Sequence, residues 1–419
     1  VCLKRGCIPT KAVLRSAQGV FEARELKQLG VDVELKGLNS SVAVKRAMGV
    51  ADRFCKGVGF LLKKNKVQVI KGKGVLKDNR TVKVAGENIK AKNIILATGA
   101  HYKSFPGLKH DGKKIIGAWE AVSMEKLPAT MAIIGAGAIG VEFAYFWHAF
   151  GVKVHMFELQ PCLLPVEDEE SSRELERAYK KYGIKMSLGL KGVSVKANAK
   201  EVVVGFQDKN AKKQELAFEK CLLAVGMTGN VDDIGLEKVG VTVEKGFVKV
   251  DSFYQTSVPG IYAIGDVAGP PLLAHAASHE GIVAVEHLAG LNPHPINPLN
   301  IPGCTYCQPQ VASVGFTEKA LKEKKIKYSV GKLPFSANGK AVASNEASGF
   351  CKVLLGEYGE LLGAHIVGFH ATEMIHEYVL FRTMEGIDEE IMATVHPHPT
   401  LGEWLGETVL NAKGRSLNF

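Results

Sequence analysis

The sequence predicts an α/β protein of several domains, since short apolar segments alternate with amphipathic stretches along most of its 419 residues. Apolar residues make up 46% and charged residues 23% of the chain, a composition that excludes a disordered or collagen-like protein. No apolar run reaches the roughly 18 residues of a membrane-spanning helix, so we expect no membrane partner. The net charge of +10 comes without a basic stripe interleaved with aromatic residues, so we expect no nucleic-acid partner.

The first hundred residues predict two helices and then three strands. The first helix follows Pro9 and ends before the glycine at position 30, which gives residues 11–29, and the second covers residues 41–65. Short segments rich in β-branched residues predict the strands Val67–Ile70, Thr81–Val84 and Asn93–Ala97.

A second α/β unit opens at Met131 with a strand, a glycine-rich turn, a helix and the strand Lys153–Phe157. A charged β-hairpin is predicted over Asn198 to Glu219. Further strands are predicted over Cys221–Val225, Phe247–Val250 and Ile261–Ile264. After a linker rich in proline and asparagine, at residues 291–302, the chain reads as an α+β domain.

Three glycines between the strand at Met131 and the next helix form the pattern G-x-G-x-x-G. Gly135 permits the tight turn, Gly137 lets the backbone approach a pyrophosphate, and Gly140 lets helix and strand pack closely. Glu158 ends the following strand, where it can accept hydrogen bonds from an adenosine ribose and repels a 2′-phosphate, so NAD is expected rather than NADP. The candidate NAD-binding residues are Gly135, Ala136, Gly137, Ala138, Ile139, Gly140, Glu158, Val193 and Gly226.

Eight cysteines in a chain of this length do not make a disulfide scaffold, so we expect a reducing compartment. Cys2 and Cys7 stand just ahead of the first helix, where the helix dipole and nearby cations lower the pKa of a thiol. In a regular helix their separation is too long for a disulfide, so a bridge needs the distorted turn that Gly6 permits. From spacing alone, dithiol–disulfide exchange and two buried structural thiols both remain open.

Residues 2–11 read C-x4-C-I-P-T-K and resemble the redox-active disulfide motif of the pyridine nucleotide–disulfide oxidoreductases, which are FAD enzymes. Residues 94–99 resemble the family's A-T-G loop, and residues 256–266 resemble its second flavin motif, whose aspartate holds the flavin ribityl chain. The resemblance covers essentially the whole chain. It implies two Rossmann-like dinucleotide-binding domains, for FAD (residues 1–125 and 252–300) and for NAD (126–251), and an α+β dimerisation domain (301–419).

Near the C-terminus, His398 and Glu403 have the spacing H-P-T-x-x-E. A carboxylate that orients an imidazole makes it a good general base, because it selects the tautomer and stabilises the imidazolium. A lone pair of this kind is more often structural. The resemblance, however, implies that the pair is the family's catalytic base, which acts across the interface of a homodimer on the partner's disulfide. His396 does not match the motif and is interpreted as a neighbour.

Within the family, the C-I-P-T-K sequence, the NAD-type Glu158, the L-L-A-H segment and a tail without paired cysteines resemble the dihydrolipoamide dehydrogenase branch. The resemblance implies oxidation of protein-bound dihydrolipoamide to lipoamide with reduction of NAD⁺, using FAD and NAD. It also implies lipoyl domains and the acyltransferase core of 2-oxo-acid dehydrogenase complexes as partners. We expect a bacterial cytoplasmic location, with an organelle matrix as the alternative. A related FAD disulfide reductase with another thiol substrate is the alternative.

The resemblance also assigns roles to individual residues. Cys2 is the interchange thiol that the substrate thiolate attacks, and Cys7 becomes the thiolate that forms a charge-transfer pair with the flavin. Lys11 and Glu142 look like the ion pair beside the flavin, although Glu142 is alternatively an ordinary surface acid of its helix. The implied FAD-binding residues are Lys11, Gly74, Thr98, Gly99, Asp266, Leu272, Leu273, Ala274 and His275.

Three features depart from the family pattern. Cys304 and Cys307 form a C-x-x-C that would suit a second redox pair or half of a zinc site, but no second metal-binding pair lies at a suitable distance. We therefore interpret the segment as interface packing and expect no metal site. Residues 226–230 read G-M-T-G-N where the family usually has G-R-R-P-N. The family's G-x-G-x-x-G for the FAD pyrophosphate has no counterpart after Val1, so we expect that β-α-β unit to be missing, and a non-catalytic NAD-binding scaffold is the corresponding alternative.

Overall fold

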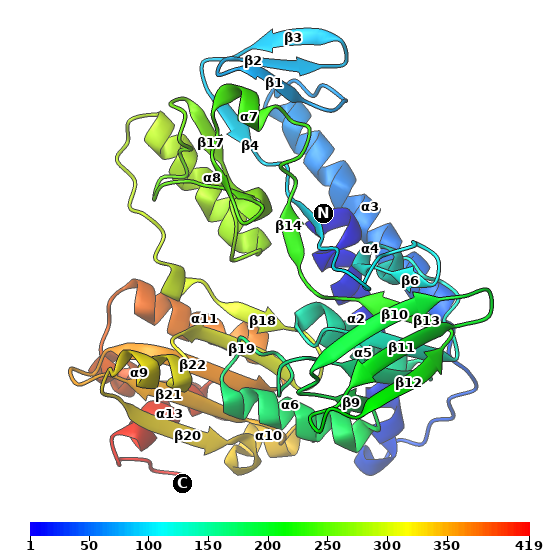
Figure 1. Ribbon diagram of the computed structural model, residues 1–419. Coiled ribbons are helices and arrows are strands. Elements are labelled where there is room, and N and C mark those ends of the chain that lie inside the picture. Colours follow the sequence, from blue (N-terminus) through cyan, green and yellow to red (C-terminus); the bar gives the residue numbers. More distant parts are fainter. The chain divides into compact units, whose positions relative to one another are not determined.

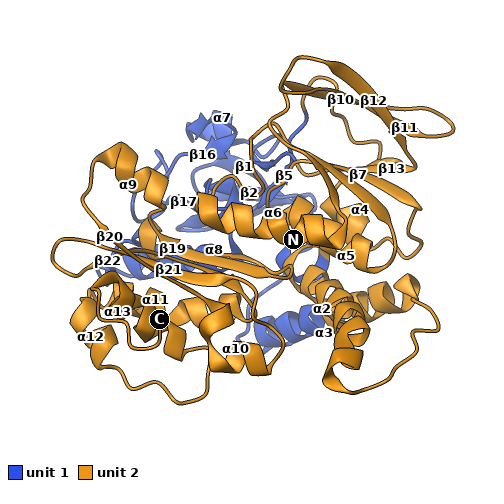
Figure 2. Cartoon of the chain, turned by 90° about the horizontal axis from the view of Figure 1, so that it is seen from below, with its two compact units in different colours: residues 1–4, 51–104, 225–297 blue, residues 5–50, 105–224, 298–419 orange.

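A computed structural model describes residues 1–419 of the protein (Figure 1). The chain forms two compact units, coloured separately in Figure 2. Unit 1 contains residues 1–4, 51–104 and 225–297, and unit 2 contains residues 5–50, 105–224 and 298–419. None of the helices combines the length and the apolar character needed to cross a bilayer.

The N-terminal helices carry the predicted redox motif. They are α1 (Cys2–Arg5), α2 (Cys7–Glu25), the 3₁₀ helix η1 (Leu26–Leu29) and the 25-residue α3 (Ser40–Lys64). Gly30 ends η1 with a φ of 79°, a left-handed conformation that glycine adopts readily. The first predicted helix is thus confirmed, although it begins at Cys7 rather than after Pro9. Both its Pro9 and its Val13 are buried.

Unit 1 is built from short strands and one long helix. A parallel pair joins β17 to β4, and an antiparallel pair joins β14 to β5. The apolar side chains of β17 and β4 share a core with Ile234 and Val248. The elements are β4 (Ile94–Leu96), β5 (Ala100–Tyr102), β14 (Met227–Gly229), α7 (Leu236–Val239), β15 (Val243–Glu244), β16 (Phe247–Val248), β17 (Ile261–Ala263), η2 (Gly265–Val267) and α8 (Ala274–Leu288).

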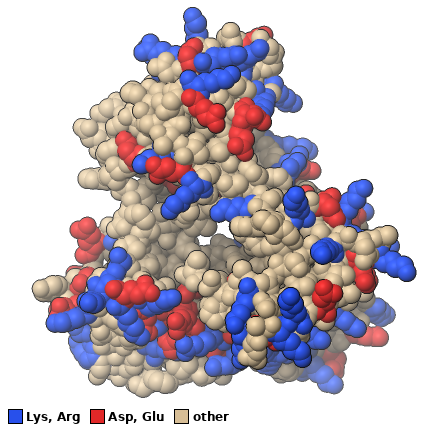
Figure 3. All heavy atoms as spheres, in the orientation of Figure 1, with Lys and Arg blue, Asp and Glu red and all other residues tan.

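Three antiparallel strands of unit 1 form a hairpin sheet, β1 (Val75–Asp78), β2 (Thr81–Val84) and β3 (Glu87–Lys90). Ala85 and Gly86 connect β2 to β3 with φ angles of 51° and 89°, which matches the two-residue hairpin turn with positive φ at both positions. Leu76 faces the core, whereas the exposed lysines and arginine of this sheet gather on its outer surface (Figure 3). Because side chains along a strand alternate between the two faces of a sheet, one face of this short sheet is buried and the other is solvated.

A five-stranded parallel sheet occupies the middle part of unit 2, in the order β6-β13-β7-β8-β9. Helix α5 (Ala138–Ala149) connects β7 to β8 and is apolar on nearly every side, because it packs on the sheet and against α2. The strands are β6 (Ile115–Ile116), β7 (Thr130–Ile134), β8 (Lys153–Phe157), β9 (Lys185–Ser187) and β13 (Lys220–Leu223). Helices α4 (Ala118–Val122) and α6 (Glu169–Tyr182) accompany them, with an antiparallel sheet of β10 (Gly192–Ala197), β11 (Val202–Gln207) and β12 (Lys213–Phe218).

The last part of unit 2 is an antiparallel sheet in the order β18-β19-β22-β21-β20, as the predicted α+β domain requires. Helix α11 packs on β19 and β22, and α13 packs on β20 and β21. The elements are η3 (Pro298–Asn300), β18 (Gly303–Thr305), β19 (Gln310–Gly315), α9 (Glu318–Lys324), β20 (Ser329–Pro334), η4 (Phe335–Ala337), α10 (Gly339–Ala343), β21 (Phe350–Leu355), β22 (Leu361–Gly368), α11 (Ala371–Thr383), α12 (Asp388–Ala393) and α13 (Glu403–Ala412).

One predicted strand is wrong. Val67–Ile70 has no regular structure, and no neighbouring strand pairs with it. A β-branched run becomes a strand only where a partner supplies the hydrogen bonds of a ladder, which a local pattern does not reveal. Similarly, the predicted strand Phe247–Val250 is regular only over Phe247–Val248.

Candidate redox and dinucleotide sites

Cys2 and Cys7 are joined by a disulfide at the start of the helical segment. The helix is interrupted between them at Gly6, whose φ of −136° and ψ of −110° lie outside the helical and extended regions that other residues favour. This break is the distorted turn that the bridge was expected to need. Cys7 is the first residue of the 19-residue helix α2, so it lies at the N-terminus of the helix, where the helix dipole is positive. The other six cysteines are free thiols.

Lys11 and Glu142 form an ion pair, with the ammonium nitrogen 3.0 and 2.9 Å from the two carboxylate oxygens. Glu142 lies on α5 with a side chain that is only 5% exposed, and it also accepts a hydrogen bond of 3.0 Å from the backbone N–H of Tyr306. The alternative interpretation of Glu142 as a surface acid is therefore wrong. Lys11 is one helical turn from Cys7, so both side chains lie on the same side of α2.

The Cys304–Cys307 segment holds two separate thiols. Cys304 lies in β18, whereas Cys307 lies beyond its end and is fully buried. Burial raises the pKa of each thiol to about 12, so both are neutral at physiological pH. No group of side chains suited to a metal ion occurs in the described chain.

The glycine turn after β7 has the geometry of a phosphate cradle. Gly135 has a φ of 100°, and a Cβ on Gly140 would lie 2.1 Å from the Gly135 carbonyl oxygen, so both positions require glycine. A Cβ on Gly137 would meet nothing within 4 Å, so the space beside this backbone is open. Helix α5 begins at Ala138, which is exposed together with Ile139, and its first backbone N–H groups can bind an anion. These residues fit a dinucleotide pyrophosphate.

Glu158 stabilises this turn directly. One carboxylate oxygen accepts a hydrogen bond of 2.7 Å from the Ala136 N–H, and the other accepts one of 2.8 Å from the Gln160 N–H. The sequence predicted only a contact with a ribose, so this bracing function was missed. Of the other candidate NAD residues, Val193 lies in β10 opposite Phe206, and Gly226, in unit 1, is exposed with a φ of 105°.

In unit 1, Asn230 fastens the A-T-G loop. Its side-chain amide donates to the Thr98 carbonyl at 2.7 Å, and its backbone N–H donates to the Gly99 carbonyl at 2.9 Å. The Thr98 hydroxyl donates back to the Asn230 carbonyl at 3.0 Å, and the His101 ring pairs with the Asn230 side chain at 2.7 Å. Asn230 was not predicted as a site residue, although the departure of residues 226–230 from the family pattern drew attention to its loop.

Asp266 lies in η2 and is half-buried. Burial raises its pKa. The neighbouring Gly265 N–H donates to the buried Glu280 at 2.5 Å. A half-buried carboxylate is suited to accept hydroxyl hydrogen bonds, so this position fits a flavin ribityl chain.

The remaining predicted flavin residues also lie in unit 1. Gly74 is exposed just before β1, Leu272 and Leu273 precede α8, and Ala274 and His275 form its first turn.

His398 pairs with Glu403 at the start of α13. The Nδ1 atom lies 2.7 Å from one carboxylate oxygen, and the other oxygen accepts a 2.7 Å hydrogen bond from the Thr400 N–H. Burial raises the pKa of Glu403, but the Thr400 N–H and His398 outweigh it and lower that pKa. With Nδ1 as the donor, Nε2 is the proton acceptor, on a side chain that is 79% exposed. The pair therefore has the chemistry of a general base.

His396 forms a second pair, 2.8 Å from Glu377 of α11. Its side chain is only 11% exposed, and the Glu377 hydrogen bond raises its pKa. The burial of His396 and its use of Nε2 in the pair agree with its interpretation as a neighbour.

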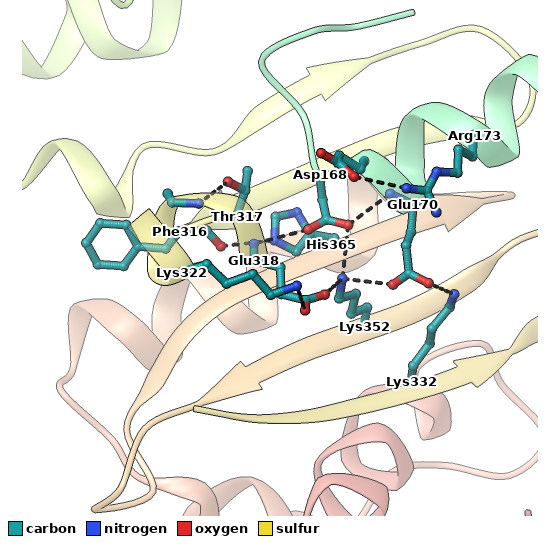
Figure 4. Close-up of polar contacts among 12 residues, drawn as sticks. Asp168, Glu170, Arg173, Phe316, Thr317, Glu318, Lys322, Lys332, Lys352 and His365 are labelled. Atoms are coloured by element: carbon teal, nitrogen blue, oxygen red, sulfur yellow. Dashed lines mark hydrogen bonds and ion pairs between the residues drawn. The ribbon is translucent and has the colours of Figure 1, made fainter. Parts of the chain in front are cut away.

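A buried lysine cluster in unit 2 connects strand β21 to the helices α6 and α9 (Figure 4). Lys352 of β21 is 0% exposed and lies 3.0 Å from Asp168, 2.8 Å from Glu170 and 2.7 Å from Glu318. Hydrogen bonds from Lys322 and Lys352 lower the pKa of Glu318 to about 2. Sequence analysis did not find this cluster, because its members come from α6, α9 and β21 and from the residue before α6.

Comparisons with known proteins agree over the full length. Residues 1–281 match the family described as pyridine nucleotide-disulphide oxidoreductase, and residues 301–409 match its dimerisation domain. Proteins named dihydrolipoyl dehydrogenase from Rhizobium etli and Zymomonas mobilis are 43% and 42% identical, with alignments that span 100% of this chain and 92% and 91% of theirs. The crystal structure of LpdA from Mycobacterium tuberculosis is similar with a TM-score of 0.89 at 25% identity, covering 97% of this chain and 90% of that one.

Proposed function

Because the chain belongs to the pyridine nucleotide-disulphide oxidoreductase family, we propose that it oxidises protein-bound dihydrolipoamide to lipoamide and reduces NAD⁺. The observation that carries this proposal is the Cys2–Cys7 disulfide at the start of α2, one turn from the Lys11–Glu142 pair. The choice of dihydrolipoamide rests on the names of the relatives that are similar over the whole chain.

Membership of the family confirms several predictions. The chain is an oxidoreductase, its family uses FAD and NAD, and its C-terminal part is a dimerisation domain. The predicted α/β fold with an α+β C-terminal part is likewise confirmed.

The first chemical step takes place at the disulfide. A substrate thiolate attacks the Cys2 sulfur, the Cys2–Cys7 bond breaks, and its electron pair leaves on Cys7 as a thiolate. The second substrate thiol then displaces Cys2, which closes the lipoamide disulfide, and its proton passes to the departing Cys2 sulfur. The helix N-terminus and Lys11 stabilise the Cys7 thiolate electrostatically. Bound FAD supplies the two-electron transfer from this dithiol to NAD⁺.

His398 removes the proton from the substrate thiol. Glu403 holds its Nδ1 hydrogen, so Nε2 accepts the proton and the carboxylate stabilises the resulting imidazolium. In the homodimer that the dimerisation domain indicates, we propose that this base serves the disulfide of the partner subunit.

The domains follow the same proposal. Residues 1–125 and 252–300 bind FAD, residues 126–251 bind NAD, and residues 301–419 form the dimer interface. Asp266 and the Thr98–Gly99 loop hold the flavin ribityl region, and the glycine turn with Glu158 holds NAD. The partners are lipoyl domains and the acyltransferase core of 2-oxo-acid dehydrogenase complexes, in the bacterial cytoplasm.

The test is a substrate comparison on the purified protein, with its flavin absorbance recorded. We expect turnover of dihydrolipoamide with NAD⁺, much weaker turnover with NADP⁺, and none of glutathione disulfide with NADPH. A protein with bound flavin that reduces only glutathione disulfide would contradict the assigned substrate, and a protein without flavin would contradict the FAD-dependent mechanism. Glu158→Gln is the matched variant for the nicotinamide preference, and we expect it to weaken discrimination against NADP⁺.

A further inference from the structure

We propose that Tyr306 is a positioning residue for the redox thiol: it holds the Lys11 ammonium group on the side of α2 that carries Cys7. The inference rests on the proposed function in one respect, that Cys7 is the thiolate formed when the disulfide opens. It also gives a role to the segment between Cys304 and Cys307, whose thiols are free in this structure.

Tyr306 touches both members of the ion pair. The Lys11 nitrogen lies 4.3 Å from the centre of the Tyr306 ring, within the range of a cation–π interaction. The backbone N–H of Tyr306 donates to the same Glu142 oxygen that lies 3.0 Å from Lys11. One residue of the C-terminal part therefore contacts the cation through its ring and the anion through its peptide.

This arrangement restricts an otherwise flexible side chain. A lysine carries a flexible four-carbon stem with many rotamers, so a single carboxylate on an exposed lysine orders it poorly. Lys11 is 34% exposed, yet Glu142 on α5 and the ring of Tyr306 both contact its ammonium group. Two contacts from separate elements define its position where one would leave it mobile.

The position matters because Lys11 follows Cys7 by four residues on α2. Side chains with this spacing are neighbours on a helix surface, and a cation near a thiol favours the thiolate. If the ammonium group moved into solvent, water and salt would screen that interaction. Tyr306 therefore acts on the thiolate through Lys11 rather than by contact with the sulfur.

The other ionisable groups around Lys11 do not replace its charge. Cys304 and Cys307 are neutral thiols, and burial raises the pKa of Tyr306 itself to about 12, so the ring is a neutral phenol. Glu373 of α11 adds negative charge near Tyr306 and Cys304. Lys4 and Arg5 of α1, just before α2, are exposed, so solvent screens their charges more strongly than that of Lys11.

The test measures the pKa of Cys7 in full-length protein that carries Cys2→Ser, so that Cys7 is a free thiol. The rate of alkylation of the Cys7 peptide by iodoacetamide, followed by mass spectrometry against pH, gives this pKa without any use of flavin or substrate. We expect Tyr306→Leu to raise it by about half to one pH unit and to slow alkylation at neutral pH about three- to tenfold. Tyr306→Phe keeps the ring and restores most of the effect. The control Tyr358→Leu, at a side chain that is 84% exposed, leaves the pKa unchanged.

A second comparison shows whether Tyr306 acts through Lys11. In a Lys11→Met background, Tyr306→Leu is expected to cause no additional shift, because the cation that it positions is absent. An equal shift in both backgrounds, no shift in either, or a Tyr306→Phe protein that behaves like Tyr306→Leu would overturn the proposal. If Tyr306→Leu does not fold, Tyr306→Met is measured instead, since its flexible side chain fills irregular space. If the unsubstituted protein does not turn over dihydrolipoamide, only the proposed function is contradicted, because the alkylation measurement does not depend on turnover.

Discussion

Two lysines of unit 2, Lys352 and Lys11, each pair with carboxylates from other secondary-structure elements. They differ in how completely these partners neutralise the ammonium charge. Lys352 is 0% exposed and contacts three carboxylates, from Asp168, Glu170 and Glu318. Lys11 is 34% exposed and contacts one carboxylate and one aromatic ring. The first connects β21 to α6 and α9, whereas the second lies one helical turn from a redox cysteine.

The difference follows from the cost of burying charge. A fully buried ammonium group is stable only when it is paired and hydrogen-bonded on all sides, and then little of its field reaches beyond its partners. A lysine with a single carboxylate keeps an open side, from which it can act on a neighbouring thiol. We therefore expect changes at Lys352 to alter stability and changes around Lys11 to alter chemistry.

The largest effect is expected from Lys352→Met. Removal of the ammonium group leaves three carboxylates together with no buried cation, which costs about 3–5 kcal/mol of unfolding free energy. Denaturant unfolding measures this loss. Lys327→Met, at an exposed pair with Glu357, is the matched control and is expected to change stability by less than about 0.5 kcal/mol. Equal losses in the two variants would remove the distinction between a buried cluster and a surface pair.

The two histidine pairs offer the same contrast between an exposed and a buried member. His398→Gln removes the proposed base and is expected to lower kcat for dihydrolipoamide about 10²- to 10⁴-fold, with little change in stability. His396→Gln, at the buried pair with Glu377, is expected to reduce stability and leave most of the turnover of the folded protein. The reverse pattern would transfer the catalytic role to His396.

Acid pH is expected to remove the stability that the Lys352 cluster contributes. The pKa of Glu318 is lowered to about 2, and those of Asp168 and Glu170 are also lowered. Burial raises both, but His365 and Lys352 outweigh it at Asp168, and Lys332 and Lys352 outweigh it at Glu170. A lowered folded-state pKa gives stability that is complete above the unfolded value near 4 and is lost as the pH falls through the folded value. Unfolding measured between about pH 5 and pH 2 should therefore steepen toward acid. The same titration of Glu318→Gln should be flatter, and an unchanged slope would exclude this carboxylate as the cause.

The smallest of these effects is expected from Glu142→Gln, which keeps the shape of the side chain and removes its charge. We expect about a tenfold fall in turnover, the equivalent of about one pKa unit at the redox thiol. Glu22→Gln, in the exposed pair with Arg15 on the same helix α2, is the matched control and should be silent. If both variants lose activity equally, the effect of Glu142 is not specific to Lys11.

The sequence predicted those parts of the molecule that depend on neighbouring residues. The glycine turn follows from Gly135 and Gly140, which local sterics make obligatory, and the break between Cys2 and Cys7 follows from Gly6. The resemblance to the family paired Lys11 with Glu142, although 131 residues separate them.

The contacts that were missed depend on tertiary packing. Lys352 contacts Asp168, which lies 184 residues away in the sequence. Tyr306, in the loop after β18, contacts Lys11 on α2, and Glu158 accepts a hydrogen bond from the N–H of Ala136. No periodicity or motif relates these partners. The same limitation explains the wrong strand at Val67–Ile70, whose composition predicts a strand but does not supply its neighbour.

The central claim, that electrons pass from dihydrolipoamide through the Cys2–Cys7 disulfide, is tested most directly by anaerobic titration with dihydrolipoamide, followed by absorbance. A Cys7 thiolate against a bound flavin should produce a long-wavelength band as one equivalent of dithiol is added, and the Cys2→Ser protein should show the band without added substrate. Both bands should be absent in Cys7→Ser. A Cys7→Ser protein that develops the same band would contradict the assignment of Cys7 and, with it, the proposed route of the electrons.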